Sequence, residues 1–215
     1  MSLPKSINEW ADHWRYIVGV NVIPADTKNK IPLVKWRDYQ NKPISEEQHK
    51  TWKLNNSFAK GMAVMPGKVW HNEPKIGLYL NFIDLDNKKA IEEFCNRNGE
   101  TTTLAELSKR MIIEQHLDEP NKAHIIFYAA KPFKKKSSDI ASLADKIRNN
   151  QIPAIEVKGA GEHGLLYCTP SVHKNGHRYQ IMGTTEPEVC DHFEKHIDDI
   201  CSKYGIPYLN ASGNK

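Results

Sequence analysis

Two carboxylates at the end of one apolar segment are the residues of this chain best placed to do chemistry. Residues 78–86 read Leu-Tyr-Leu-Asn-Phe-Ile-Asp-Leu-Asp, which is typical of a buried strand that ends in Asp84 and Asp86. Side chains alternate along a strand, so both acids point to the same face. Neighbouring carboxylates repel each other unless a cation lies between them, and Mg²⁺ or Mn²⁺ prefers such oxygen ligands. The pair indicates a divalent metal site, although the same spacing is also common on protein surfaces.

A third acid, Glu156, lies inside a second apolar segment, residues 152–157. An isolated carboxylate is costly to bury. Glu156 is therefore either an edge-strand residue that faces solvent or a third ligand that faces Asp84 and Asp86 from a neighbouring strand. Three acids are enough to hold two metal ions, as in enzymes of phosphoryl transfer.

Phosphate-binding groups are the next feature of the sequence. His124 opens the apolar segment 123–129, where it is either a hydrogen-bonded structural histidine or a donor to a substrate phosphate. The segment 156–179 combines glycines, which allow close backbone approach, with donors that suit a polyphosphate. It also reads as a hairpin closed by Asn-Gly. Its donors are Ser171, His173, Lys174, His177 and Arg178.

The stretch from Lys28 to Lys53 contains seven Lys or Arg residues and three acids, with aromatic residues interleaved. It is either a template-binding surface or a solvated loop and helix. The run 134–136 is expected to be a solvated turn. The net charge of +4 permits a nucleic-acid partner without demanding one.

The elements that must position these residues alternate between helices and strands, with hairpins among them. This mixture predicts a mixed α/β (α+β) sheet structure rather than an all-parallel one. We expect helices at 7–18, after Ser45, and at 88–96, 104–110, 139–149 and 186–204. We expect strands at 20–23, 61–66, 76–83, 111–114, 123–129 and 179–182, and a hairpin of 152–158 with 164–169.

Composition excludes two broad classes. The chain has 215 residues, of which 39% are hydrophobic and 26% charged, values that fit neither a membrane protein nor a wholly disordered chain. The N-terminus lacks a secretory signature, and the four cysteines have neither zinc nor disulfide spacing. We therefore expect a cytoplasmic protein with reduced, buried thiols and no membrane partner.

The order of the motifs resembles that of the archaeo-eukaryotic primase superfamily, and within it the bifunctional primase–polymerase family of replication proteins. The resemblance runs through nearly the whole chain. It rests on Lys30-Ile-Pro-Leu-Val-Lys-Trp36, on Gly61 to Gly67, on Phe82-Ile-Asp-Leu-Asp86, on Lys122-Ala-His124, on Ile155-Glu156 and on Thr169-Pro-Ser-Val-His-Lys-Asn-Gly176.

The resemblance implies a primase catalytic core over residues 1–209, with an RRM-like sheet unit packed on a second α/β unit. Residues 210–215 form a polar tail, and longer family members carry a helical or helicase domain after the core. The chain is thus either a fragment of a longer replication protein or a stand-alone polymerase.

The resemblance also implies template-directed nucleotidyl transfer, as a DNA primase or DNA polymerase, in replication or repair of a prokaryotic, viral or plasmid genome. Asp84, Asp86 and Glu156 would hold two Mg²⁺ or Mn²⁺ ions, and His124 would bind the phosphates of an NTP or dNTP. Lys122 stands where the family has serine, so the role of that serine is not carried over.

The expected substrate contacts come from two further groups of residues. Lys122, Lys158, Ser171 and His173 would bind the nucleotide beside His124. Template DNA and the primer strand would lie on Lys28, Lys30, Lys35, Trp36, Arg37 and Arg178.

Two other classes of function compete with this prediction. An RRM-like module that binds single-stranded nucleic acid would need no chemistry, but acids occupy its most informative strand and repel phosphate. A metal-dependent nuclease of the replication-initiator type would need a His-x-His pair, which the sequence lacks.

Overall fold

The computed structural model describes residues 3–97, 99–116, 119–159, 164–172, 176 and 178–207. Its centre is an antiparallel sheet in the order β10–β11–β5–β9–β8–β12, with β4 also pairing with β5. This sheet is the wall that carries the candidate site. Its strands are β4 (Gly67–Lys68), β5 (Tyr79–Leu85), β8 (Ile112–His116), β9 (Glu119–Ala129), β10 (Lys136–Ser137), β11 (Ile155–Lys158) and β12 (Gln180–Met182).

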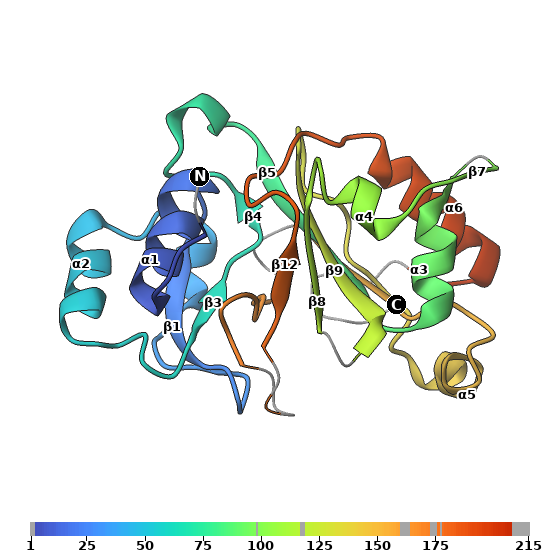
Figure 1. Cartoon of the computed structure of the whole chain (residues 1–215), viewed down its shortest axis with the longest axis horizontal. Helices are drawn as coiled ribbons and strands as arrows, with labels where there is room; N and C mark the ends of the chain where they lie inside the picture. The colour runs from blue at the N-terminus through green and yellow to red at the C-terminus, as the bar shows by residue number, and fades with distance from the viewer. Residues whose placement is uncertain are drawn as a thin grey trace.

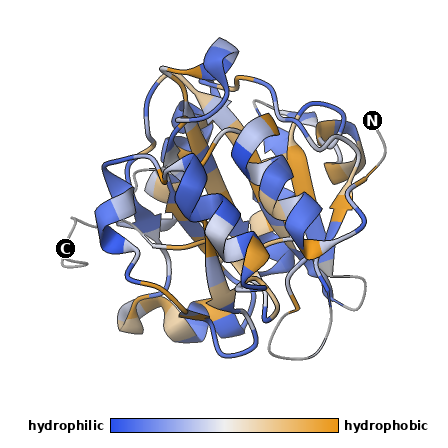
Figure 2. Ribbon diagram, turned by 90° about the vertical axis from the view of Figure 1, so that its left-hand side faces the viewer, coloured by the Kyte–Doolittle hydropathy of each residue, from blue (hydrophilic) through white to orange (hydrophobic). Residues whose placement is uncertain are grey.

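An N-terminal unit covers one face of this sheet, on the left of Figure 1. Viewed from that side, its helices are largely hydrophilic toward the viewer and the strands behind them are hydrophobic (Figure 2). The unit contains α1 (Ile7–Asp12), the π-helix η1 (His13–Ile17), the 3₁₀-helix η2 (Arg37–Gln40), α2 (Glu46–Leu54) and the sheet β2 (Ile31–Pro32), β1 (Val22–Asp26), β3 (Met62–Val64). As predicted, α2 begins after Ser45, whose hydroxyl accepts the N–H of Gln48.

Helices that follow β5 in the chain cover the other face, on the right of Figure 1. They are α3 (Lys88–Cys95), α4 (Leu104–Leu107), η4 (Ala141–Leu143), α5 (Ala144–Arg148) and α6 (Phe193–Tyr204). The short elements η3 (Glu73–Lys75), β6 (Asn96–Arg97) and β7 (Glu100–Thr101) lie in the connections.

Strand alternation divides the hydrophobic core in two. On β5, Leu80 and Phe82 belong to the core shared with the N-terminal unit, whereas Ile83 and Leu85 belong to the core under α3 and α6. Asp84 alternates with Ile83 and Leu85, so it shares the face of Phe82 and looks toward the N-terminal unit. The mixed α+β architecture predicted from the sequence is confirmed.

The predicted hairpin of 152–158 with 164–169 is wrong. β11 pairs with β5 and β10, and Leu166 forms an isolated bridge with Val64 of β3 instead. The physical reason is that Ile155 and Val157 pack in the core under α3, whereas Leu166 packs in the core of the N-terminal unit. The tip expected at 159–162 lies largely outside the described residues.

Two other local expectations also need correction. Lys136 is not part of a solvated turn, because it lies in β10, is buried, and forms an ion pair with Asp198 of α6. The last helix begins at Phe193 rather than at residue 186, because the preceding backbone bonds to β9: Glu188 accepts from Tyr128, and Cys190 donates to it.

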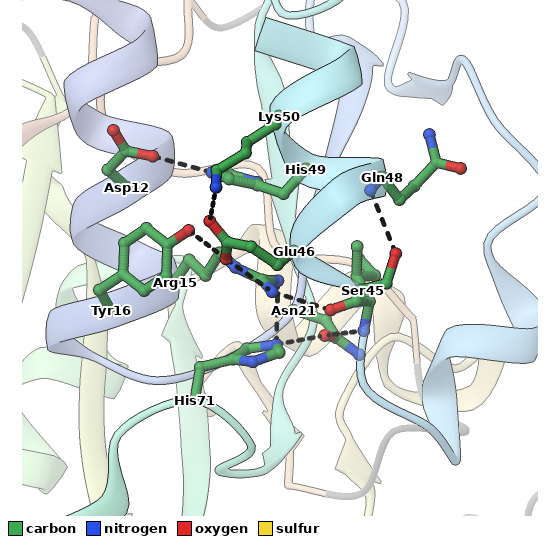
Figure 3. Close-up of polar contacts among 11 residues, drawn as sticks. Asp12, Arg15, Tyr16, Asn21, Ser45, Glu46, Gln48, His49, Lys50 and His71 are labelled. Atoms are coloured by element: carbon green, nitrogen blue, oxygen red, sulfur yellow. Dashed lines mark hydrogen bonds and ion pairs between the residues drawn. The ribbon is translucent and has the colours of Figure 1, made fainter.

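A buried polar network holds the N-terminal unit together (Figure 3). The guanidinium of Arg15 donates to the carbonyl of Ile44 at 2.9 Å and lies 3.1 Å from Nε2 of His71. The side chain of Asn21 accepts the N–H of Ile44 and donates to the carbonyl of Tyr39. These contacts tie η1 to the segment that leads into α2.

Within the described part of the chain, no helix combines the length and apolar character needed to cross a membrane. All four cysteines are buried and unpaired, as expected for reduced thiols.

Candidate active site

A row of ionisable side chains crosses four strands of the large sheet. Glu156 of β11 lies directly opposite Asp84 of β5, Asp84 lies opposite His124 of β9, and His124 lies opposite Glu114 of β8. Residues directly opposite each other in a ladder point to the same face. The register therefore places Glu156 on the same face as Asp84, which is the arrangement that a shared cation site requires.

Asp86 lies just beyond the end of β5, two residues after Asp84. Its backbone N–H donates to the carbonyl of Ala154 at 2.9 Å, so the pairing with the β11 side continues past the strand end. Its side chain is 54% exposed, against 20% for Asp84. Asp86 is thus the most exposed of the three acids that were predicted to hold metal ions.

Each acid faces a basic side chain. Lys158 lies 3.0 Å from Glu156, Lys122 lies 3.7 Å from Asp86, and Nε2 of His124 lies 3.8 Å from Asp84. Among the described residues, no three or more His, Cys, Asp or Glu side chains lie so that they could hold a metal ion in their present positions.

The donor atoms of the site nevertheless fit a divalent cation. Burial raises the pKa of Asp84 to about 6; the carboxylates of Asp86 and Glu156 add to the shift, and the charges of His124 and Lys158 oppose it. A cation bound beside Asp84 would favour its ionised form. The donor atoms are carboxylate oxygens, which are the ligands that Mg²⁺ and Mn²⁺ prefer.

His124 is set firmly in the row. Burial alone would lower its pKa, but the carboxylates of Asp84 and Glu114 outweigh that effect and raise it. The ring packs against Phe82 and Tyr179.

Two cavities open beside the acids and share Asp86. The first has a volume of about 70 Å³ and is lined both by acids, Asp84, Asp86, Glu114 and Glu119, and by Lys30, Lys122 and His124. The second, of about 330 Å³, lies on the Glu156 side and is lined by Ser137, Ser138, Asp139 and Ile147 among others. Lys30, Lys122 and His124 line the first cavity, and none of these three lines the second.

Lys30 was predicted to contact nucleic acid, and the structure brings it to the first cavity. It ends the turn between β1 and β2, where its backbone has a φ of 54°. The N-terminal unit in this way supplies a cation to a site that is otherwise built on the large sheet.

Ser171 was predicted to bind nucleotide, but the structure does not bring it to the first cavity. It is buried, and its hydroxyl donates to the carbonyl of Met62 in β3 at 3.1 Å. His173, which was also predicted to bind nucleotide, lies outside the described residues.

The other residues predicted to bind nucleic acid line neither of these two cavities. Lys28, Lys35 and Arg37 are exposed on the N-terminal unit, and Trp36 packs half-buried against its core. Arg178 is exposed beside Tyr179, and its backbone forms an isolated antiparallel β-bridge with Val172.

Glu114 is the residue of the row that was not singled out from the sequence. It follows Met-Ile-Ile at the end of an expected strand, and its side chain is fully buried. The signal that pointed to Glu156, an acid inside an apolar strand, applies equally to Glu114.

A mixed α+β core whose antiparallel sheet carries acids beside histidine and lysine has the form expected of a primase-type catalytic domain. The family model described as bifunctional DNA primase/polymerase, N-terminal, matches residues 13–192. The chain therefore belongs to this family, as the order of the motifs indicated. The family implies DNA primase/polymerase activity and hence nucleotidyl transfer. The comparison with curated proteins gives no match.

Proposed function

We propose that this protein is a template-directed nucleotidyltransferase of DNA replication or repair that works with two divalent metal ions. The observation that carries the proposal is the register of the sheet, which sets Glu156, Asp84 and His124 side by side on one face with Asp86 at the strand end. The family match supports the same reaction class.

Asp84, Asp86 and Glu156 would hold Mg²⁺ or Mn²⁺. The bound cations would supply a lowered pKa for the attacking hydroxyl and neutralisation of charge on the triphosphate and the pyrophosphate that leaves. The raised pKa of Asp84 supports this assignment, because a buried carboxylate among other acids is stabilised when a cation joins it.

The lysines and the histidine would bind the triphosphate of an incoming NTP or dNTP. Lys122 and Lys158 neutralise Asp86 and Glu156 in the metal-free protein, and would turn to the phosphates once those acids hold cations. Lys30 and His124 line the first cavity together with Lys122, and they would also contact the phosphates.

The exposed cations of the N-terminal unit would hold the template and the primer. Lys28, Lys35 and Arg37 provide charge for the phosphate backbone, and Trp36 lies between them.

The test is a primer-extension assay with a labelled primer–template, Mn²⁺ and dNTPs. We expect the wild-type protein to extend the primer, and we expect Asp84→Asn to lose at least about a thousandfold in rate, since it removes a ligand of a two-metal site. Asp145→Asn is the matched control, because Asp145 is an exposed carboxylate of α5 whose partner is Arg148. It should retain wild-type activity.

Three outcomes would count against the proposal. Shortening of the primer would identify a nuclease, and a mobility shift without synthesis would identify a binding module. Extension that persists in Asp84→Asn would reject the assignment of the acids.

A further inference from the structure

We propose that Glu114 is a positioning residue that fixes the ring orientation and the tautomer of His124. The inference rests on the proposed function only for what His124 then does, since the contact itself is a property of the fold. Glu114 belongs to β8 and was not singled out from the sequence.

The first observation is that both oxygens of Glu114 are occupied. Oε2 lies 3.1 Å from Nδ1 of His124, and Oε1 accepts the backbone N–H of Thr169 at 2.8 Å. The Glu114 side chain has no exposed surface. Burying a carboxylate is favourable only when its lone pairs meet donors, and here each oxygen meets one.

The second observation is that this pairing distinguishes the two ring nitrogens. A carboxylate only accepts hydrogen bonds, so Nδ1 of His124 must carry a proton toward Glu114. Nε2 is then the nitrogen that faces Asp84, at 3.8 Å, and the cavity. A histidine whose orientation is set by a buried carboxylate is a recurring device in enzymes.

The third observation is that the ring has little room to rotate. The Phe82 ring lies at 73° to the imidazole with ring centres 4.9 Å apart, and the Tyr179 ring packs against the imidazole at 4.6 Å and 31°. Thr169, held by Glu114 through its N–H, donates its hydroxyl to the carbonyl of Tyr179. Glu114 thus holds the imidazole directly and also fixes the segment that packs Tyr179 on it.

The variant Glu114→Gln tests this role without a change of size. Because the N–H of Thr169 can only donate, the amide oxygen of Gln must face Thr169 and the amide NH₂ must face His124. Nδ1 of His124 then becomes an acceptor, and the proton of the neutral ring moves to Nε2. The packing is retained while the tautomer is reversed.

The first measurement is ¹⁵N NMR of the His124 ring in the full-length, metal-free protein, at a pH where the ring is neutral. We expect a protonated Nδ1 in the wild type and a protonated Nε2 in Glu114→Gln. Glu188→Gln, which removes an exposed carboxylate paired with Arg110, is the control and should leave the His124 signals unchanged. An unchanged tautomer in folded Glu114→Gln would overturn the proposal.

The second measurement is the affinity for a fluorescent dNTP in the presence of Mn²⁺. Glu114→Gln should weaken binding by about tenfold to a hundredfold, by analogy with the loss seen when the carboxylate that orients a metal-binding histidine is removed. In a His124→Ala background the same change should have almost no effect, because the group through which it acts is gone. An equal loss in both backgrounds would show that Glu114 does not act through His124.

Together, the two measurements distinguish a failure of the proposed function from a failure of the role proposed for Glu114. A wild-type protein that binds no nucleotide would overturn the proposed function, and the NMR experiment alone would then decide whether Glu114 positions His124.

Discussion

The carboxyl group of Asp84 lies in surroundings that favour its neutral form. Its pKa in the folded protein is about 6, whereas a carboxyl group of an unfolded chain titrates near 3.8. The folded state therefore binds more protons between these values, and the stability that this group contributes is lost as the pH rises through 6.

We predict that Asp84→Asn stabilises the metal-free protein. At pH 8 in EDTA its free energy of unfolding should exceed that of the wild type by about 2 kcal/mol, because the amide has no charge to bury. The difference in free energy of unfolding between the variant and the wild type should become smaller below pH 5. Thermal unfolding followed by circular dichroism measures the difference, with Asp145→Asn as the control. A variant that is less stable than the wild type at every pH contradicts the prediction.

Added Mn²⁺ should stabilise the wild type more than Asp84→Asn, and so should oppose the difference in stability predicted for the metal-free proteins. A ligand that binds the folded state raises its stability, so the wild type should gain several degrees in melting temperature at millimolar Mn²⁺. Asp84→Asn should gain little. Equal gains in both proteins would place the metal elsewhere.

Lys30 supports a kinetic prediction. If it contacts the triphosphate, Lys30→Ala should raise the KM for dNTP by about tenfold with a smaller effect on kcat, since a hydrogen bond to a charged group contributes about 1.5–3 kcal/mol. Lys28→Ala is the control, because Lys28 lies in the same turn but does not line the cavity. Equal KM values for the two variants would remove Lys30 from the site.

These residues differ in how readily the sequence reveals them. Asp84, Asp86, Glu156 and His124 could be found because each follows or interrupts an apolar strand. Lys30 was assigned to template binding because it belongs to a basic stretch with interleaved aromatic residues, and nothing local shows that the turn before β2 reaches the large sheet. That contact depends on how the N-terminal unit packs, which is a property of the tertiary structure.

At the scale of elements, the polar network of Arg15 and His71 predicts that the stability of the N-terminal unit depends on pH. Burial, together with the charge of Arg15, lowers the pKa of His71 to about 4 from an ordinary value of 6.5. The unfolded chain therefore binds more protons between these values. The stability due to neutral His71 is present above pH 6.5 and is lost as the pH falls toward 4.

We predict that His71→Asn makes the N-terminal unit less sensitive to acid. The wild type should lose on the order of 3 kcal/mol through His71 between pH 6.5 and 4, and the variant should not, because Asn offers an acceptor to Arg15 but takes up no proton. Urea unfolding at several pH values, followed by tryptophan fluorescence, gives the comparison. Parallel pH profiles for the two proteins would contradict this account.

Element types could be predicted better than element partners. The cap at Ser45 and the alternation in 78–86 are local signals, and α2 and β5 appear where they indicated. The partner of β11 could not be predicted, because Ile155 and Leu166 are both apolar and only the folded chain assigns them to different cores. The buried Lys136 likewise depends on Asp198, sixty-two positions later in the sequence.

At the scale of the whole molecule, the modest charge of +4 is distributed unevenly around the site. Lys28, Lys35 and Arg37 are exposed on the N-terminal unit, while the acids lie on the sheet that it faces. A strand of DNA held by these cations would approach the acids from the side of Lys30.

We predict that the triple variant Lys28→Ala, Lys35→Ala, Arg37→Ala binds single-stranded template more weakly. The slope of log affinity against log salt should fall by about 0.7 for each phosphate that the variant no longer neutralises. The control replaces Lys109, Lys146 and Lys195, which are exposed among the helices of the opposite face, and its slope should match the wild type. Fluorescence anisotropy at several salt concentrations measures both, and identical slopes would locate the template elsewhere.

The alternation of β5 has a consequence for how this domain can change over evolution. Deleting or inserting one residue within Tyr79–Leu85 would exchange the two faces of the strand beyond that point. Ile83 and Leu85 would then face the lysines of the site, and the carboxylates would be buried in the hydrophobic core under α3. A substitution in this strand changes one side chain, whereas a change in its length moves every side chain beyond it to the other face. Related chains should therefore vary freely in their loops and hold the number of residues in this strand constant.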